Sequence, residues 1–267
     1  MPDQVRHDET MTSPLLTMMI DAALEAGEEI ERFYDEGCEQ SEKPDGSPVT
    51  EADRAAEEII LDHLRRAYPK VPVLAEEEAS EGRIPELGER FFCVDPLDGT
   101  KGFVQRTGEF TVNIALVEGG VPVAGVIYVP VTGVLYYGAR GEGAFKAQEG
   151  EAEAITTREP IAGLLTGVGS RNHAAPDTQA RNAALGISDY LPSSSSLKFC
   201  LVAEGAADVY PRYGPTSEWD TAAGQAILEA AGGRVMELDS DGREVGPLAY
   251  GHPERGFLNP HFIAWGR

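Results

Sequence analysis

The sequence predicts an α+β fold in which helix pairs and sheets are layered in two halves. Segments with apolar residues at helical spacing are interleaved with short runs of β-branched residues along the whole chain. The pattern also changes near residue 150, where a strand meander gives way to strands that alternate with helices. We therefore expect an N-terminal half at residues 1–150 and a C-terminal half at residues 151–267.

The N-terminal half begins with two predicted helices. Residues 1–12 are expected to form a loose arm. A helix is predicted from Ser13, which is followed by a proline in the manner of an N-cap and first turn, to Gly37. The polar, proline-containing residues 39–49 predict a mobile loop. A second helix is expected over residues 50–67, where a nearby proline ends it.

Short apolar runs predict the strands and bound the remaining helices. In the N-terminal half, strands are expected at 71–74 and 91–94, followed by an antiparallel meander through 110–117 and 121–137. In the C-terminal half, strands are expected at 164–168, 207–210, 235–238 and 262–265, and helices at 177–185, 195–204 and 221–231. The stretch 121–139 carries no charge, but its prolines and glycines favour strand–turn–strand over a membrane span.

Composition disfavours several classes of function. The formal net charge of −23 opposes binding to nucleic-acid polymers and to anionic membranes. It favours a free cytoplasmic protein over one loosely associated with the inner membrane, as does an N-terminus too polar for a signal peptide. Cys38, Cys93 and Cys200 form no CxxC pair, so neither a disulfide nor a zinc site is expected. A monomer and a homodimer are equally compatible with the sequence.

The sharpest chemical signal is Asp-Pro-Leu-Asp-Gly-Thr at residues 95–100, directly after a predicted buried strand. Two carboxylates this close repel each other unless a cation or a proton lies between them. Gly99 lets the backbone bend so that successive N–H groups converge on an anion. This combination suits Mg²⁺ and a phosphate. An Asx-type turn with two exposed acids is the alternative.

Other polar residues each have a structural alternative. The acidic run 76–78 fits a solvated loop, and Asp220 fits a helix cap. Asp53 fits a capping box at the start of its helix. His173 and Lys198 fit ordinary surface positions. Their occurrence together, in one order and spacing, is what favours a site.

In this order, the motifs match a family signature. The sequence resembles the lithium-sensitive, magnesium-dependent phosphomonoesterases of the inositol monophosphatase superfamily. That superfamily contains inositol monophosphatases, fructose-1,6-bisphosphatases and 3′(2′),5′-bisphosphate nucleotidases. The segments that carry the resemblance are Asp53, Glu76-Glu77, residues 95–100, Trp219-Asp220 and Gly232-Gly233. The resemblance runs from about residue 15 to the C-terminus and implies a layered αβαβα sandwich.

Within the superfamily the chain looks most like the bacterial bisphosphate nucleotidases of the CysQ type. The supporting segments are residues 46–50, 100–103, 108–116, 170–173, 195–205 and 210–216. The resemblance implies hydrolysis of the 3′-phosphate of adenosine 3′,5′-bisphosphate, a by-product of sulfate assimilation, to AMP and phosphate. Some such enzymes also accept the sulfated form. The chain departs from the pattern at Gly102, where many bacterial relatives carry Glu, and at Ser194, where a glycine is expected.

The resemblance implies a set of metal ligands for two or three Mg²⁺ ions. Glu76, Asp95 and the backbone carbonyl of Leu97 would hold one ion. Asp95, Asp98 and Asp220 would hold a second, with Asp95 bridging. A third, weaker ion would join with the substrate near Glu76.

The resemblance also implies catalytic and substrate-binding roles. Thr100 and Asp53 would orient the attacking water and accept its proton. The backbone amides of Gly99 and Thr100 would bind phosphate oxygens, beside Asp220. The candidates for contacts with the base, the ribose and the second phosphate are His173, Ser195, Lys198 and Arg212.

Three alternatives remain open at this point. The same chemistry on inositol monophosphate, fructose-1,6-bisphosphate or histidinol phosphate differs only in substrate. An aspartyl-phosphate phosphatase would use Asp95 as a nucleophile, but two helices and a strand precede the motif here. A catalytically silent metal-binding regulator is the alternative outside the enzymes, although none of the metal acids is replaced.

Overall fold

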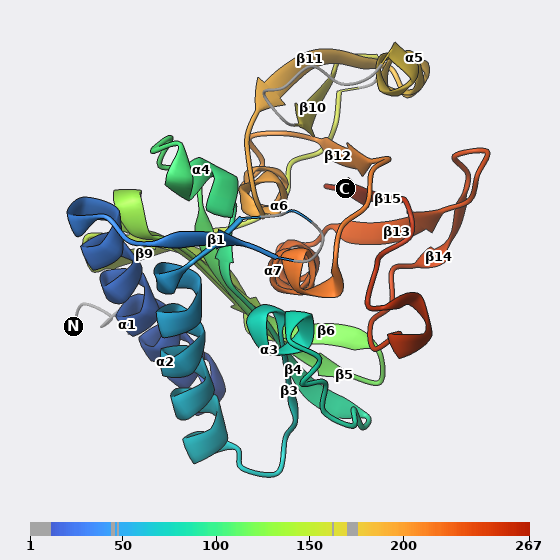
Figure 1. Cartoon of the computed structure of the whole chain (residues 1–267). Coiled ribbons are helices and arrows are strands. Elements are labelled where there is room, and N and C mark those ends of the chain that lie inside the picture. Colours follow the sequence, from blue (N-terminus) through green and yellow to red (C-terminus); the bar gives the residue numbers. More distant parts are fainter. Residues whose placement is uncertain (1–11, 44–45, 47, 162, 170–175) are drawn as a thin grey trace, which may run out of the picture.

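The computed structural model describes residues 12–43, 46, 48–161, 163–169 and 176–267. The chain folds into five layers, in the order helices, sheet, helices, sheet, helix (Figure 1). The predicted layered αβαβα sandwich is therefore confirmed. Within the described residues, no helix is long and apolar enough to cross a membrane.

The first layer consists of α1 (Pro14–Glu36) and α2 (Glu51–Ala67), which pack side by side on the first sheet. The Ser13 hydroxyl caps α1 by accepting a hydrogen bond from the Leu16 amide, as the sequence predicts. The first sheet has seven strands in chain order: β3 (Val73–Ala75), β4 (Arg90–Asp98), β5 (Thr111–Glu118), β6 (Val121–Val129), β7 (Val134–Ala139), β8 (Gly143–Gln148) and β9 (Glu151–Ile155). Only the β3–β4 pair is parallel.

The middle layer consists of α6 (Leu197–Ala203) and α7 (Ala222–Ala230), which lie between the two sheets. At Gly125 of β6 the sheet approaches α7 so closely that an added Cβ would lie 2.4 Å from the Ala223 carbonyl oxygen. The second sheet has the strand order β11 (Ile187–Pro192), β10 (Leu165–Gly169), β12 (Val209–Arg212), β15 (Phe262–Trp265), β13 (Arg234–Leu238) and β14 (Glu244–Pro247). The outer helix α5 (Pro176–Ala184) packs beside β11.

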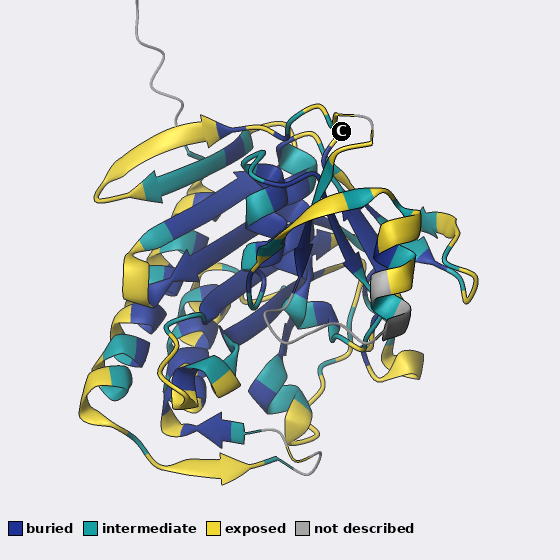
Figure 2. Ribbon diagram, turned by 90° about the horizontal axis from the view of Figure 1, so that it is seen from above, coloured by how far each residue is buried: buried dark blue, intermediate teal, exposed yellow. Residues whose placement is uncertain are grey.

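A small apolar cluster around Val209 lies on the second sheet. Two large apolar cores fill the other spaces between the layers, and they appear as dark-blue strands and helix faces in Figure 2. One core joins α1 and α2 to the first sheet, and the other joins that sheet to α6, α7 and the second sheet. Cys93 and Cys200 are buried in the second core, where each packs as a small apolar side chain. The uncharged stretch 121–139 forms the central hairpin β6–β7 around the 3₁₀ turn η1 (Pro130–Thr132), which confirms the strand–turn–strand prediction.

The prediction of a mobile loop over residues 39–49 is wrong for the part that the structure describes. Strand β1 (Gln40–Glu42) pairs antiparallel with β2 (Pro48–Thr50). The residues of β1 are polar and exposed, so its sequence lacks the apolar alternation by which a strand is recognised. This hairpin places Lys43 next to the acidic run at residues 76–78.

Other short elements were not predicted, or began at a different residue than predicted. The first predicted strand begins two residues later than expected, at Val73. The elements not predicted are β8, β9, β11, β14, α3 (Glu76–Ser80), α4 (Thr100–Val104) and the 3₁₀ turns η2 (Glu218–Asp220) and η3 (Pro253–Arg255). Most are five residues or shorter, or pair at a sheet edge, where one face is solvated and the apolar signal is weak.

Candidate active site

Asp53 is buried at the first turn of α2, where its carboxylate serves two purposes. One oxygen, Oδ2, accepts hydrogen bonds from the Thr50 amide at 2.7 Å and the Thr50 hydroxyl at 2.6 Å, and the expected capping box is present. The other oxygen, Oδ1, accepts a hydrogen bond from the Thr100 hydroxyl at 3.0 Å. Two residues far apart in sequence thus form a hydroxyl–carboxylate pair.

The segment 95–100 forms a bulged end of β4 and not a plain turn. Pairing with β5 holds at Asp95 and resumes at Asp98, so the two residues between them loop out of the ladder. The strand predicted to end at Asp95 therefore continues to Asp98. The Leu97 amide donates a hydrogen bond to Asp95 Oδ1 at 3.0 Å, which fixes the first carboxylate.

Gly99 occupies a backbone conformation that strongly favours glycine. Its φ of +98° lies in the left-handed region. A Cβ added at Gly99 would lie 2.4 Å from the Ser195 hydroxyl oxygen and 2.9 Å from the Glu109 carbonyl oxygen. This close approach lets the turn before α4 pack directly against the segment before α6.

Asp98 is held by two residues that the sequence analysis did not single out. Its Oδ2 accepts a hydrogen bond from the Ser196 amide at 2.7 Å and a longer one from the Asn113 side chain at 3.5 Å. The Ser196 hydroxyl in turn donates to Asn113 Oδ1 at 2.7 Å. A polar Asn113 inside the apolar run of β5 was the available signal for this contact, because buried polar groups need partners.

Asp220 lies in the 3₁₀ turn η2, just before α7, and accepts a hydrogen bond from the Ser217 amide at 2.9 Å. Its neighbour Glu218 is buried, and its carboxylate accepts bonds from the amides of Gly251 and His252 at 2.7 and 2.9 Å. The turn is therefore anchored to a distant loop. The cap predicted at Asp220 is present, but it closes η2 and not α7 itself.

Three of these carboxylates repel one another in surroundings poor in water. Burial, together with the charges of Glu76, Asp98 and Asp220, raises the pKa of Asp95 well above its usual range. Burial and the charges of Asp98 and Glu76 raise the pKa of Asp220 to about 8. Burial also raises the pKa of Asp98, although Lys198 opposes this. Any cation that enters such a cluster relieves this repulsion and stabilises the ionised carboxylates.

Glu76 begins α3, directly after β3, and its carboxylate is joined to Lys43. The Lys43 ammonium lies 2.7 Å from Glu76 Oε1 and 2.7 Å from Glu77 Oε1, and only 8% of its side chain is exposed. Burial lowers the pKa of Lys43, but the two carboxylates raise it by more, so the group stays an ammonium.

The acids fit Mg²⁺ by their chemistry, because all are hard oxygen donors whose mutual repulsion a divalent cation would relieve. Within the described ranges, no three acidic, histidine or cysteine side chains already stand together as a finished metal site. One oxygen of Glu76, Oε1, is bonded to Lys43, which partly neutralises the charge of this carboxylate.

A pocket of about 270 Å³ brings together most of the remaining predicted residues. The predicted residues that line it are Asp98, Gly99, Ser195, Lys198, Arg212 and Asp220, and Lys101 also contributes to its wall. His173 lies outside the described residues. Carboxylates and basic side chains from both halves of the chain thus line one pocket, and the charge of Asp98 acts on nearby Lys198.

Lys198 is a buried cation in this pocket. Its side-chain ammonium donates a hydrogen bond to the Ser195 carbonyl at 2.6 Å and lies 5.5 Å from the centre of the Tyr210 ring. Burial lowers the pKa of Lys198 to about 8 in spite of the nearby Asp98. An anion bound in the pocket would stabilise the charged form of this group.

Arg212 and Ser195 have different surroundings. Arg212 donates one hydrogen bond, from Nη2 to the Pro215 carbonyl at 3.0 Å, while its buried Nε has no hydrogen-bond partner among the described residues. The Ser195 hydroxyl points to the protein, within 3.0 Å of the Asp98 carbonyl and 3.3 Å of the Glu109 carbonyl. Arg212 thus retains a donor for a ligand, whereas Ser195 joins α6 to the end of β4.

Comparison with known proteins agrees with this geometry. The model of the inositol monophosphatase family matches residues 11–260. The chain belongs to the inositol monophosphatase family. Two similar relatives are the 3′(2′),5′-bisphosphate nucleotidases CysQ of Salmonella typhimurium and Escherichia coli, which are 46% and 45% identical to this chain over 250 residues. Each comparison covers 93% of this chain and 98% of the relative.

Solved structures of inositol monophosphatase family members share the fold. CysQ from Bacteroides thetaiotaomicron superposes with a TM-score of 0.77 at 41% identity, covering 94% of this chain and 97% of the other. An inositol monophosphatase from Anabaena superposes with a TM-score of 0.72 at 29% identity, covering 94% and 90%. The predicted family, and the predicted likeness to its CysQ-type members, are both confirmed.

Proposed function

We propose that this member of the inositol monophosphatase family is a Mg²⁺-dependent phosphatase that removes the 3′-phosphate of adenosine 3′,5′-bisphosphate, leaving AMP. The observation that carries the proposal is a single pocket lined by Asp98 and Asp220 together with Lys198 and Arg212. A substrate with two phosphates places one beside the carboxylates, through bound metal, and the other beside the basic side chains. The names of the CysQ relatives support the same substrate class.

The proposed cofactor is a set of two or three Mg²⁺ ions. Glu76, Asp95, Asp98, Asp220 and the Leu97 carbonyl would hold them, and the bound ions would supply an activated water and charge stabilisation for the leaving oxygen. The chain's own residues do the rest. The Thr100 hydroxyl, which donates a hydrogen bond to Asp53 Oδ1, would pass a proton from the attacking water to that carboxylate.

Burial raises the pKa of Asp53, which suits a group that accepts a proton. Its hydrogen bonds with Thr50 hold the carboxylate in the orientation that faces Thr100. The backbone amides at Gly99 and Thr100, where α4 begins, are the proposed donors to the phosphate that is cleaved.

The second phosphate is proposed to bind Lys198 and Arg212. Both side chains line the pocket, and the buried Nε of Arg212 has a hydrogen bond to donate. A monophosphorylated sugar would leave these cations unpaired, which costs binding free energy. The proposal therefore favours the bisphosphate over inositol 1-phosphate.

The test is phosphate release from adenosine 3′,5′-bisphosphate, its sulfated form, inositol 1-phosphate and fructose-1,6-bisphosphate, each with Mg²⁺ and with a chelator. Magnesium-dependent preference for the nucleotides is the expected result. Preference for a sugar phosphate would overturn the substrate and leave the metal assignment standing. No turnover of any substrate, with Mg²⁺ still binding, would favour a regulator over an enzyme.

A further inference from the structure

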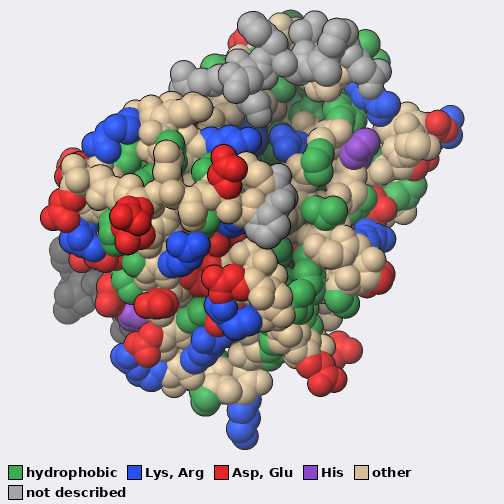
Figure 3. Space-filling view, viewed as in Figure 1, with side chains coloured by type: hydrophobic (Ala, Val, Ile, Leu, Met, Phe, Trp, Pro, Cys, Tyr) green, Lys and Arg blue, Asp and Glu red, His purple; other side chains and the backbone are tan. Residues whose placement is uncertain are grey.

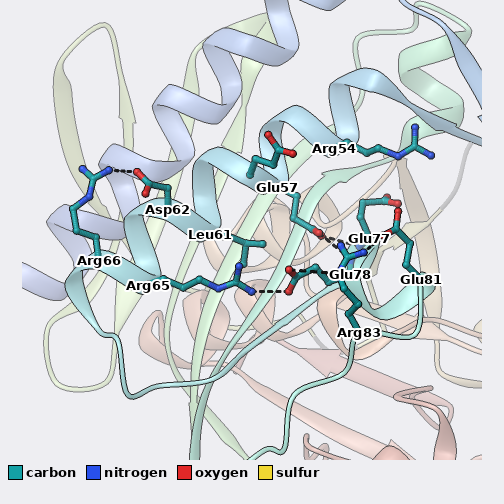
Figure 4. Close-up of a pocket in the computed structure, with 11 residues that line it drawn as sticks. Arg54, Glu57, Leu61, Asp62, Arg65, Arg66, Glu77, Glu78, Glu81 and Arg83 are labelled. Atoms are coloured by element: carbon teal, nitrogen blue, oxygen red, sulfur yellow. Dashed lines mark hydrogen bonds and ion pairs between the residues drawn. The ribbon is translucent and has the colours of Figure 1, made fainter.

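A hollow of about 760 Å³ lies between α2 and α3 and is lined mainly by acidic and basic side chains (Figure 4). Glu57 reaches into it from α2, yet its side chain is among the buried charged groups, at 3% exposure. Its two carboxylate oxygens are divided between consecutive amides: Oε2 accepts from the Glu77 amide at 2.8 Å and Oε1 from the Glu78 amide at 2.9 Å.

These amides belong to the first turn of α3, where backbone N–H groups have no partner within the helix. The local sequence does not provide one, because the N-cap position is Ala75 and no side chain in the cap accepts a bond. Glu57 therefore supplies from another helix the cap that α3 lacks. A carboxylate at a helix N-terminus also interacts favourably with the helix dipole.

The other ion pairs at α3 are either exposed or do not reach its backbone. Figure 4 shows Arg65 of α2 joined to Glu78, an ion pair in which the arginine side chain is about half exposed. Such exposed pairs contribute little to stability. Lys43 holds the side chains of Glu76 and Glu77 but not the backbone of α3.

The position of Glu57 on its helix links two parts of the candidate site. Glu57 and Asp53 are four residues apart, so they lie on the same face of α2, one turn from each other. Asp53 bonds to Thr100 at the end of β4, while Glu57 bonds to the segment that follows β3. One rigid helix thus sets the distance between the Asp53–Thr100 pair and Glu76.

We propose that Glu57 is a positioning residue: by capping α3 from α2, it aims the Glu76 carboxylate at Asp95 and Asp220 and thereby sets the affinity for the divalent cation without touching it. This inference rests on the proposed function, in which Glu76 is a metal ligand. It also explains why a charged residue is buried at a place where it meets no substrate.

The test compares Glu57→Gln with Glu58→Gln, a matched control on the same helix that removes the same charge from an exposed side chain of the same hollow. Mg²⁺ binding is measured by titration calorimetry without substrate. Glu57→Gln keeps one acceptor and loses the other, so its Kd for Mg²⁺ is expected to rise about tenfold, the low end for groups that orient metal ligands. Glu58→Gln is expected to bind Mg²⁺ like the wild type.

Steady-state kinetics distinguish a loss of Mg²⁺ affinity from a general loss of activity. In Glu57→Gln, the Mg²⁺ concentration for half-maximal activity should rise by the same factor, while KM for the bisphosphate at saturating Mg²⁺ stays within about twofold of wild type. Unchanged Mg²⁺ affinity in Glu57→Gln, or an equal loss in Glu58→Gln, would overturn the proposal.

Two further measurements keep the outcome unambiguous. Glu76→Gln serves as the reference for a lost ligand: if it binds Mg²⁺ like wild type, the ligand assignment of the proposed function has failed, and not merely the role of Glu57. Should Glu57→Gln fail to fold, hydrogen exchange in the wild type decides. Slow exchange of the Glu77 and Glu78 amides in the metal-free protein is expected, and rapid exchange at both would refute the cap.

Discussion

Asp95 is a charged group in a place where charge is costly, since it is 2% exposed and surrounded by other carboxylates. Asp95→Asn removes a proposed bridging ligand while keeping the size of the side chain. We expect turnover to fall by roughly a thousandfold, the order of loss for a key electrostatic group, with weaker Mg²⁺ binding. Phosphate release and calorimetry measure both effects, and Asp62→Asn on the exposed face of α2 is the control. Near-normal activity of Asp95→Asn would remove this residue from the site.

The role proposed for Lys198 leads to a prediction about substrate choice. Lys198→Ala removes a cation that lines the pocket, so KM for the bisphosphate should rise at least about tenfold, or about 1.4 kcal/mol. KM for a monophosphate such as 3′-AMP should change far less. Equal increases for the two substrates would show that Lys198 does not recognise the second phosphate.

A substitution at Gly99 tests how tightly the end of β4 packs against Ser195. Gly99→Ala adds a methyl group that would collide with Ser195 at an unfavourable φ, whereas Gly37→Ala meets the unfavourable φ alone because nothing lies within 4 Å. Overpacking adds about 1–3 kcal/mol to the cost of the backbone strain. Thermal unfolding should therefore show a larger loss for Gly99→Ala than for Gly37→Ala. Similar losses would mean that Ser195 moves aside freely.

At the residue scale, the sequence predicted which acids gather but not what holds them. Asp53, Asp95, Asp98 and Asp220 were recognisable because their motifs combine in one order. The residues that bond to these acids were not recognisable, because each contact joins segments far apart in the chain. Ser196 meets Asp98 across 98 residues, and Lys43 meets Glu76 across 33. Nothing in the local spacing of Glu57, Ser196 or Lys43 distinguishes them from ordinary surface or core residues.

At the scale of elements, α2 depends on the capping box that also orients Asp53. Thr50→Ala removes the hydroxyl that donates to Asp53, which should cost about 1 kcal/mol of stability and lower kcat as the carboxylate loses its fixed orientation. Thr50→Ser keeps the hydroxyl and should restore both. Thermal unfolding and steady-state kinetics of the two variants provide the comparison, and a kcat for Thr50→Ala equal to that of wild type would separate the cap from catalysis.

Elements with a strong apolar period were predicted well, and elements stabilised by partners were not. Helix α1 and the β6–β7 hairpin bury continuous apolar faces, so their sequences predict them directly. Strand β9 has four exposed residues in a row of five and forms because β8 offers an edge. Helix α3 is too short to form alone and is capped from α2, so its existence depends on the tertiary fold.

At the scale of the whole molecule, carboxylates with raised pKa values make stability depend on pH. The pKa values of Glu57 and Glu77 are raised by burial to about 7, and that of Asp220 to about 8. A carboxyl group with a raised pKa stabilises the fold while it is protonated, and this stabilisation is lost as the pH rises through the folded-state pKa. Each such group contributes a slope of up to about 1.4 kcal/mol per pH unit.

We therefore expect the Tm of the metal-free protein to fall by several degrees between pH 6 and pH 8, at about 2–4 °C per kcal/mol for a chain of this size. Saturating Mg²⁺ should flatten the dependence, because bound cations favour the ionised acids. Differential scanning calorimetry in chelator and in Mg²⁺ makes the measurement. A Tm of the metal-free protein that rises between pH 6 and pH 8 would show that these acids do not have raised pKa values in the folded state. On the face shown in Figure 3, red and blue side chains are interspersed, so acidic side chains at this surface have basic side chains nearby.

The spacing of Asp53 and Glu57 on α2 has a consequence for how the chain can change over evolutionary time. The exposed Arg54 and half-buried Ala55 between them can be exchanged for other helix-forming residues without moving either carboxylate. A single inserted or deleted residue is different, because it turns Glu57 by about 100° around the helix axis. Such a change would uncouple α3 from Thr100. This turn of α2 should therefore tolerate substitution at Arg54 and Ala55, but neither substitution at the fully buried Ala56 nor a change of length.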